Sequence, residues 1–287
     1  MSPAGEPAAQ SRPVEPVDAV TVMVVRDAPT ATAAGADDAD RLEVLLLERH
    51  AASAFAPGAL VFPGGKLDPI DATLPDGCVR WSAPDAWATR LGVADTGQAR
   101  ALLVAAVRET FEEAGVLLAC HADGTALADR PLPAAEVASV RDRMAARDGS
   151  HDWARWLLRH GLLLDLDALV MWSWWVTPAG LPRRFDTRFL IAALPPGQHA
   201  SHDAVETTAM RWTTPAAALS AYATGQLHVI YPTRCTLEQL DAHPTAAAAV
   251  RAARAGAVDL RRIEPTVVHV DGTPMVQHPD GGPPAAV

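Results

Sequence analysis

The chain has 287 residues, of which 49% are hydrophobic and 20% are charged. This composition is typical of a globular protein and excludes a disordered or fibrous chain. Acidic residues outnumber basic ones by 34 to 24, a formal net charge of −10, which argues against a protein that coats nucleic acid through its phosphates.

Cysteine usage and hydropathy bear on the cellular compartment. Cys78, Cys120 and Cys235 are far apart and form no CxxC pair, so neither a disulfide framework nor a zinc ribbon is indicated. We therefore expect a reducing, cytoplasmic location. The longest apolar stretch is far shorter than the ~20 residues of a membrane helix. We expect partners that include neither nucleic acid nor a membrane.

The first half of the chain begins with a segment rich in proline and alanine, residues 1–17, which we expect to be disordered. Two strands are predicted next, over residues 19–26 and 42–49. A stretch punctuated by glycine and proline follows at 57–65. After it comes a helical region that ends near Gly115.

The second half alternates between predicted helices and strands. The predicted elements are helices over 134–147 and from Ser150 to about 161, strands over 170–177, 184–194 and 210–213, helices over 215–223 and 233–255 with a break near Pro244, and a terminal hairpin around 267–272. Strands that alternate with helices indicate an α/β fold class.

Three glutamates share one face of the helix that precedes Gly115. At 100° per residue, Glu109, Glu112 and Glu113 fall within about 100° of one another. The opposite face carries an apolar stripe formed by Val104, Val107, Phe111 and Ala114. Packing of that stripe would aim the three carboxylates away from the core.

Such crowding of carboxylates is unfavourable in an isolated helix. Like charges at these spacings cost about 0.2–0.5 kcal/mol per pair, and Arg108 offsets part of the cost because it lies four residues before Glu112. A divalent cation would offset more, since magnesium binds carboxylate and phosphate oxygens. The alternative is a solvated acidic face without a metal.

The residues around this helix resemble the Nudix hydrolase signature. In that family a glycine is followed after five residues by a glutamate, and after seven more by Arg-Glu-U-x-Glu-Glu-x-Gly-U, where U is aliphatic. The matching residues here are Gly65, Asp71, Arg108-Glu109, and Glu112-Glu113 with Gly115 and Val116. Asp71 replaces the first glutamate and Thr110 an aliphatic residue. Moreover, 36 residues separate Asp71 from Arg108, an insertion of 29.

A signature split in this way is similar to the coenzyme A diphosphatase-like branch of the mammalian peroxisomal type. The segments that carry this similarity are 45–49 with 57–65, 172–178 with 183–187, and Glu206 with Trp212, Pro232-Thr233 and Leu237. The similarity spans roughly residues 18–245. However, Ala54 stands where the bacterial coenzyme A motif has an arginine, which removes one argument for that substrate.

The resemblance implies a mixed β-sheet sandwiched between α-helices, with helical insertions and a C-terminal helical extension. The expected divisions are a disordered segment 1–17, a Nudix domain 18–217, C-terminal helices 218–263 packed on it, and a terminal hairpin and tail 264–287. Within the Nudix domain we expect one insertion at 72–107, inside the signature, and a helical insertion at about 120–165.

The resemblance also implies hydrolysis of a diphosphate bond with magnesium or manganese (Mg2+ or Mn2+). Carried over by position, the metal ligands are Glu109, Glu112, Glu113, the Gly65 carbonyl and Glu206, and the catalytic residues are Glu109, Glu112 and Arg108. The identity of the general base, the participation of Asp71 and the role of the 72–107 insertion stay open.

Four residues are expected to bind substrate: Arg49, Lys66, Arg184 and Trp174. Arginine forks suit phosphate oxygens, and Arg183 and Arg188 are further candidates, although surface charge or pairing with Asp186 is the alternative. Because side chains alternate along a strand, Trp172 and Trp174 are expected to point together, for adenine stacking or for core packing.

The expected substrate is a small molecule linked to a nucleoside diphosphate, foremost coenzyme A or acyl-coenzyme A, cleaved to 3′,5′-ADP and (acyl-)phosphopantetheine. Two other hypotheses stay open. One is a Nudix hydrolase of ADP-ribose, NAD(H) or nucleoside triphosphates, and the other is a non-catalytic Nudix regulator that binds a ligand. The sequence also leaves the oligomeric state open, a homodimer being one option.

Overall fold

The computed structural model describes residues 14–29, 41–53, 56–146, 153–203 and 207–286. The α-helices are α1 Pro69–Thr73, α2 Pro84–Leu91, α3 Thr96–Ala114, α4 Ala134–Ala146, α5 Trp153–His160, α6 Pro215–Ala223, α7 Tyr231–Leu240 and α8 Ala246–Arg254. The strands are β1 Val17–Asp27, β2 Leu42–Arg49, β3 Leu60–Val61, β4 Gly64–Lys66, β5 Val79–Arg80, β6 Ala119–His121, β7 Leu162–Asp165, β8 Val170–Val176, β9 Phe185–Ala193, β10 Thr207–Thr213, β11 Arg262–Ile263, β12 Thr266–Val270, β13 Thr273–Gln277 and β14 Ala285–Ala286. Two short 3-10 turns lie at Asp76–Cys78 and Leu166–Ala168.

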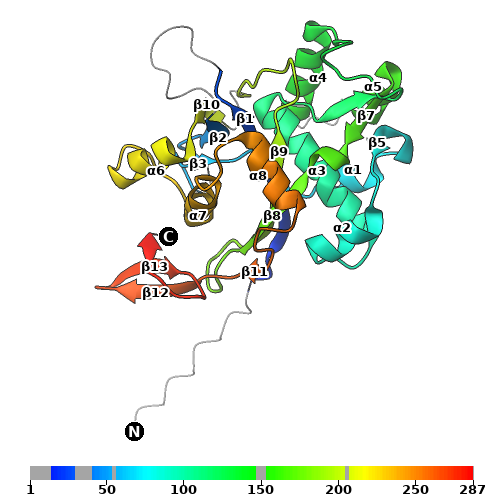
Figure 1. Cartoon of the computed structure of the whole chain (residues 1–287). Helices are drawn as coiled ribbons and strands as arrows, with labels where there is room; N and C mark the ends of the chain where they lie inside the picture. The colour runs from blue at the N-terminus through cyan, green and yellow to red at the C-terminus, as the bar shows by residue number, and fades with distance from the viewer. Residues whose placement is uncertain (1–13, 30–40, 54–55, 147–152, 204–206, 287) are drawn as a thin grey trace.

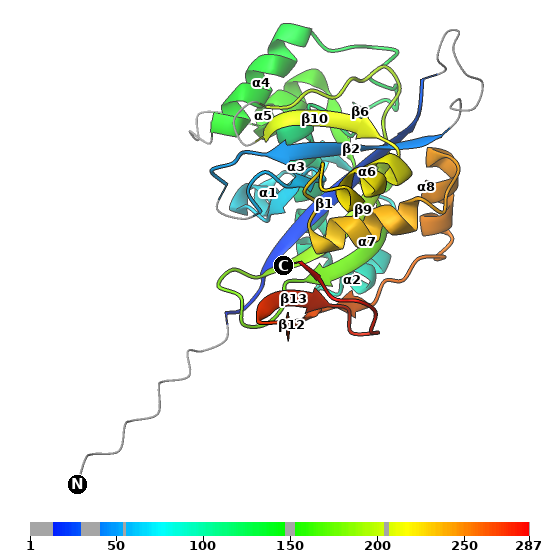
Figure 2. The same ribbon diagram turned by 90° about the vertical axis from the view of Figure 1, so that its left-hand side faces the viewer.

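A mixed sheet forms the centre of the described part of the chain. Its strand order is β10-β2-β1-β9-β8-β11, with β3 paired to β2 and β4 paired to β1. The pairs β1–β9 and β8–β11 are parallel, whereas the other pairs of this sheet are antiparallel. Helices α2 to α5 lie on one side of the sheet and α6 to α8 on the other, as Figures 1 and 2 show.

Strand β1 shows why both faces of the sheet are covered. Val20, Val22 and Val24 pack into the hydrophobic core beneath α3, whereas Met23 and Val25 pack into a second core beneath α6 to α8. Alternate residues of a strand point to opposite faces, so an uninterrupted apolar run requires helices on both. The expected sheet sandwiched between helices is therefore confirmed.

The long insertion inside the signature is ordered. Residues 72–107 contain the end of α1, the first 3-10 turn, β5, α2 and the first three turns of α3. Helix α3 begins after Asp95, whose side chain accepts a hydrogen bond from the Gln98 amide at 2.8 Å, and ends at Gly115 with φ of +68°. Aspartate and left-handed glycine are favoured at these two ends of a helix.

The expectation that Trp172 and Trp174 point together is wrong, because strand β8 contains an irregularity. Its pairing with β9 shifts register between Met171 and Ser173. A bulge inserts one residue and breaks the two-residue alternation of side chains. As a result, Trp172 and Trp175 pack into the core beneath α6 to α8, and Trp174 packs on the opposite face.

The C-terminal region places further elements beside the sheet. Helices α7 and α8 are separated around Pro244, as predicted. Strands β12 and β13 form an antiparallel hairpin whose turn residues, Asp271 and Gly272, have φ of +50° and +79°. In both views this hairpin lies next to the β8–β9 turn (Figures 1 and 2). None of the described helices is long and apolar enough to cross a membrane.

Candidate active site

The three glutamates of α3 are buried, which corrects the expectation of a carboxylate face aimed away from the core. Glu109, Glu112 and Glu113 are only 3%, 7% and 4% exposed. The apolar stripe of α3 packs into the hydrophobic core as predicted, but other segments cover the acidic face. Strand β4 and the residues after it lie against one part, and Arg141 of α4 donates to the Glu112 and Glu113 carbonyls at 2.8 and 2.9 Å. The solvated acidic face is therefore excluded.

Asp71 and Arg108 join the two halves of the split signature. Arg108 Nε donates to Asp71 Oδ1 at 2.7 Å and Arg108 Nη2 to Oδ2 at 3.0 Å. Asp71 is fully buried, and its Oδ2 also accepts the Asp68 amide at 2.8 Å within the capping box of α1. The residues that flank the insertion are thus in direct contact, and Asp71 belongs to the buried cluster around Arg108.

Arg108 also contacts two of the glutamates. Its Nη1 lies 2.9 Å from Glu109 Oε1 and 3.3 Å from Glu112 Oε2, and its Nη2 donates to the Lys66 carbonyl at 3.2 Å. Burial acts to lower the pKa of Arg108, but the Asp71 hydrogen bond and the charges of Glu109, Asp71 and Glu112 outweigh burial and raise the pKa. This guanidinium stays charged and fixes three carboxylates.

Strand β4 needs glycine at two successive positions. The Gly64 amide donates to Glu113 Oε2 at 2.9 Å, and Gly64 has φ of +156°, which disfavours any side chain. A Cβ on Gly65 would lie 2.4 Å from Glu109 Oε1. The two glycines therefore let the backbone approach the carboxylates of α3 closely.

The chemistry of this cluster fits a divalent cation. Three buried carboxylates, those of Asp71, Glu109 and Glu112, contact the buried Arg108 guanidinium, and the buried Glu113 carboxylate accepts the Gly64 amide. The side chains that this cluster offers to an ion therefore all present oxygen atoms. In the described ranges, however, no three histidine, cysteine, aspartate or glutamate side chains converge on one point as the ligands of an ion would. Instead, the N–H groups of Arg108 and Gly64 bond to the carboxylates. Glu206, the fifth expected ligand, lies outside the described residues.

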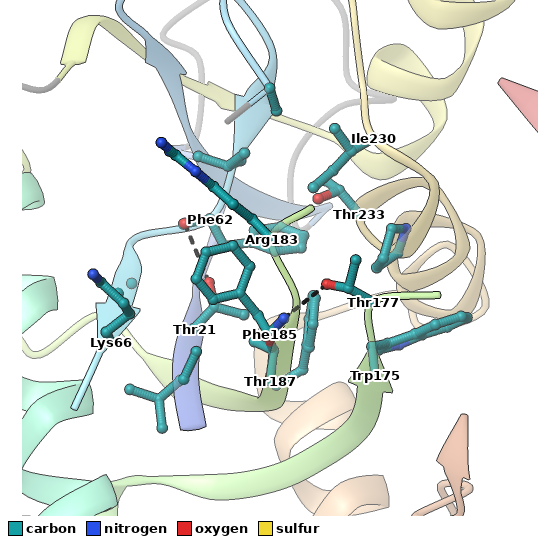
Figure 3. Close-up of a pocket in the computed structure, with 18 of the residues that line it drawn as sticks. Thr21, Phe62, Lys66, Trp175, Thr177, Arg183, Phe185, Thr187, Ile230 and Thr233 are labelled. Carbon is teal, nitrogen blue, oxygen red and sulfur yellow. Dashed lines mark hydrogen bonds between the residues drawn. The ribbon is translucent and has the colours of Figure 1, made fainter. Parts of the chain in front are cut away.

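A cavity of about 870 Å³ adjoins this cluster. Gly65, Arg108 and Glu109 contribute to its wall on the side of α3. Its floor consists of alternate residues of three adjacent strands, namely Ala19 and Thr21 of β1, Phe185, Thr187 and Phe189 of β9, and Trp175 of β8. Figure 3 shows Lys66 on one side of this floor and Trp175 on the other.

Two of the four expected substrate-binding residues line the cavity. Arg49 and Lys66 do so, and Arg183, a secondary candidate, joins them (Figure 3). These three side chains place positive charge in the cavity, and Lys66 belongs to β4, which contacts the carboxylate cluster. Such an arrangement can hold an anionic ligand whose phosphates lie next to a bound cation.

Arg184 and Trp174 do not line the cavity. Trp174 lies on the opposite face of β8 from Trp175, and Arg184, directly before β9, bonds to other parts of the chain. Arg184 donates to the carbonyls of Thr177 and Val14 at 3.0 and 2.9 Å, and it also forms an ion pair with Glu264. The indole N–H of Trp174 donates to Asp186, and the Arg188 guanidinium lies 4.7 Å from the Trp174 ring centre. Both side chains therefore bond within the fold, Trp174 on the face of the sheet beneath α3 and Arg184 beside Glu264.

Two groups of residues that line the cavity were not predicted to bind a ligand. One is the start of α7, Tyr231 to Thr233, together with the strand residue Phe185. The other is the pair formed by Pro265, directly before β12 of the C-terminal hairpin, and Val276 of β13. The only available signal was the alternation of Phe185, Thr187 and Phe189, which identifies one face of a strand but not what lies over it.

Comparisons with known proteins agree with this geometry. Residues 83–240, more than half of the chain, match the family model described as the NUDT19 Nudix domain. The chain is 32% identical over 226 residues to the protein of Gallus gallus named acyl-coenzyme A diphosphatase NUDT19, covering 66% of this chain and 58% of that protein. It is 31% identical over 220 residues to the Homo sapiens protein of the same name, covering 64% and 56%. The chain thus spans less than two thirds of the length of these relatives.

A solved structure shows the same fold. A NUDIX hydrolase from Alicyclobacillus acidocaldarius superposes with a TM-score of 0.64 at 30% sequence identity, over 83% of this chain and 96% of the other. The family match includes α3 with its three glutamates. The chain belongs to the Nudix family, in the group described by the NUDT19 Nudix domain.

Proposed function

We propose that the chain is a metal-dependent hydrolase that cleaves the diphosphate bond of coenzyme A or acyl-coenzyme A. The products are 3′,5′-ADP and phosphopantetheine or its acyl thioester. The names of the chicken and human relatives support this substrate class. The observation that carries the proposal is the buried cluster of Asp71, Arg108 and the α3 glutamates beside a cavity lined by positive side chains.

The proposed ion is Mg2+ or Mn2+. Glu109, Glu112, Glu113 and the Gly65 carbonyl would hold it, and we keep Glu206 as a further proposed ligand. When bound, the ion supplies positive charge next to the diphosphate and lowers the pKa of coordinated water. Oxygen donors from carboxylates and a backbone carbonyl suit these hard cations.

The residues of the chain have distinct roles in this proposal. Glu109 is the glutamate of α3 that lines the cavity, so we assign it to accept the proton of the attacking water. Arg108 contacts Glu109, Glu112 and Asp71 and acts through them, which makes it a positioning residue. Glu112 and Glu113 complete the negative charge that a cation neutralises.

The cavity suits a coenzyme A-sized ligand. Its volume of about 870 Å³ is at the upper end of the range of roughly 300–1,000 Å³ that small-molecule sites occupy. We assign Arg49, Lys66 and Arg183 to the phosphates of the substrate, because these cationic side chains line the cavity.

We further propose a cytoplasmic location, which is supported by the lack of a disulfide at Cys78, Cys120 and Cys235, all within the described ranges.

The proposal is tested with the purified protein and a panel of diphosphates. Coenzyme A, palmitoyl-coenzyme A, ADP-ribose and NADH are incubated separately with Mg2+ or Mn2+, and the products are identified by mass. We expect 3′,5′-ADP from the two coenzyme A compounds and little cleavage of the others. Rapid cleavage of ADP-ribose or NADH with coenzyme A left intact would contradict the substrate. Binding without any cleavage would favour a ligand-binding regulator.

A further inference from the structure

The C-terminal hairpin forms one wall of the cavity although it lies beyond the family match. The family model ends at residue 240, whereas Pro265 and Val276, which line the cavity, belong to the segment that carries β12 and β13. Figure 1 shows this segment at the C-terminal end of the described chain, beside the β8–β9 turn. The wall is therefore a feature that the family match does not explain.

Several contacts fix this wall to the sheet. Ile263 of β11 pairs with Trp175 of β8, Arg262 Nε lies 3.1 Å from an Asp186 carboxylate oxygen, and Glu264 forms an ion pair with Arg184. These contacts hold the first residues of the segment against β8 and β9.

Further along the segment, the ring of His278 meets Trp175 edge-on, with centroids 5.8 Å apart. Val276 is 4% exposed and belongs to the core beneath α6 to α8. The wall is consequently packed as part of the fold.

The registers of the sheet separate the wall from the carboxylate cluster. Lys66 of β4 pairs with Ala19 of β1, Ala19 with Thr187 of β9, Thr187 with Trp175 of β8, and Trp175 with Ile263 of β11. Four strand spacings of about 4.8 Å place the start of the wall roughly 19 Å from the β4 backbone. The cavity thus extends across the sheet from the cluster towards the hairpin.

The far end of the cavity differs from the near end in chemistry. Near the carboxylates the lining includes Lys66, Arg108 and Glu109. Towards the hairpin most of the lining is aromatic or aliphatic, namely Trp175, Pro178, Tyr231, Pro265 and Val276, with Thr177 and Thr233 as polar neighbours. A ligand that spans the cavity is therefore expected to be charged at one end and apolar at the other.

We propose that this wall holds the acyl group of an acyl-coenzyme A and that Val276 limits the length of acyl chain accepted. The inference rests on the proposed function. A phosphopantetheine arm has the extended length of four to five peptide residues, about 15 Å. If the phosphate of the arm lies beside Glu109, the extended arm covers about 15 Å of the roughly 19 Å to the start of the wall. Its sulfur therefore lies about one strand spacing, ~4.8 Å, short of the hairpin. The thioester-linked chain then meets Pro265 and Val276.

The test compares Val276→Phe and Val276→Ala with Val270→Phe, a control on the same hairpin at a position that is 44% exposed. The readout is kcat/KM for palmitoyl-coenzyme A divided by kcat/KM for free coenzyme A. This ratio does not depend on how much of each variant is folded. We expect Val276→Phe to lower the ratio about tenfold, as one altered apolar contact can. Val276→Ala shifts it the opposite way, and Val270→Phe leaves it at the wild-type value.

Each other outcome has a defined meaning. A ratio unchanged in both Val276 variants overturns the inference, and it would place the adenosine end of the substrate at this wall if both kcat/KM values fell together. A wild-type protein that cleaves free coenzyme A but not palmitoyl-coenzyme A also overturns it while leaving the proposed function intact. A wild-type protein that cleaves neither compound refutes the proposed function, and the inference falls with it.

Discussion

Arg108 on α3 and Asp71 on α1 form a two-bond ion pair, with N–O distances of 2.7 and 3.0 Å, across an insertion that separates them by 36 residues. Both side chains are buried, at 6% and 0% exposure. The pair closes the inserted segment and aligns α3 against β4. Because the guanidinium also contacts Glu109 and Glu112, the geometry of the acidic cluster depends on this contact.

We expect Asp71→Ala to destabilise the protein strongly. The variant removes both Asp71 hydrogen bonds from the buried Arg108, which still pairs with Glu109 and Glu112, so we expect a cost of about 3 kcal/mol, the lower end of the range for breaking a buried ion pair. Urea denaturation measures the free energy of unfolding. The matched control is Asp85→Ala in α2, an exposed aspartate in the first turn of its helix, for which a loss below about 1 kcal/mol is expected. Equal losses in the two variants would show that the Asp71–Arg108 pair is not structurally important.

Gly65→Ala should impair activity more than folding. Its Cβ would lie 2.4 Å from Glu109 Oε1, so the carboxylate or β4 must move, and a displacement near 1 Å can cost about 100-fold in rate. Gly77→Ala is the control, because a Cβ there meets nothing within 4 Å. Coenzyme A cleavage and thermal melting are measured for both variants. Unchanged activity in Gly65→Ala would contradict the close approach of β4 to Glu109.

The neighbours Arg183 and Arg184 should respond differently to substitution by methionine. Arg183 lines the cavity, so Arg183→Met is expected to raise KM about tenfold with little change in melting temperature. Arg184 is buried and bonded to Glu264 and two carbonyls, so Arg184→Met is expected to lower the melting temperature with a smaller change in KM. The reverse pattern would assign the substrate contact to Arg184.

Arg141 should contribute to stability through the C-terminal end of α3. Its guanidinium donates to the carbonyls of Glu112 and Glu113 and lies 2.6 Å from Ser201 Oγ. Loss of these bonds in Arg141→Ala is expected to cost about 1–3 kcal/mol. Arg143→Ala is the control, since Arg143 is exposed and contacts Ser139 on its own helix. Urea denaturation distinguishes the two, and equal stabilities would refute the role of Arg141.

Much of the fold could be predicted because its main elements carry strong local patterns. The apolar run of β1, the limits of β2 and α6, and the break at Pro244 follow from periodicity and from proline and glycine positions. The two- and three-residue strands β3 to β6 were missed, since so short a segment shows no periodicity. The boundaries of the expected domains stay predictions.

The candidate site was only partly predictable. The face shared by Glu109, Glu112 and Glu113 follows from helix geometry, but their burial depends on β4, α1 and α4, which are brought there by tertiary packing. The bulge in β8 places Trp172 and Trp174 on opposite faces of the sheet instead of the same face, because strand alternation holds only in a regular strand. The hairpin wall could not be predicted, since no local signal reports which surface a hairpin covers.

If the α3 glutamates make this chain a diphosphatase, Glu112→Gln should abolish cleavage without unfolding the protein. Glutamine keeps the size of the side chain and can still bond to its neighbours, so folding should change little. Loss of the negative charge that is proposed to hold the metal ion should lower coenzyme A cleavage by about 100-fold or more. The control is Glu43→Gln, which removes a charge paired with Arg26 on β1. The measurement is the rate of 3′,5′-ADP formation, followed by mass at matched Mn2+ concentrations. We expect wild-type rates for Glu43→Gln and a near-complete loss for Glu112→Gln. Equal rates in the two variants would show that the charge of Glu112 is not needed for cleavage.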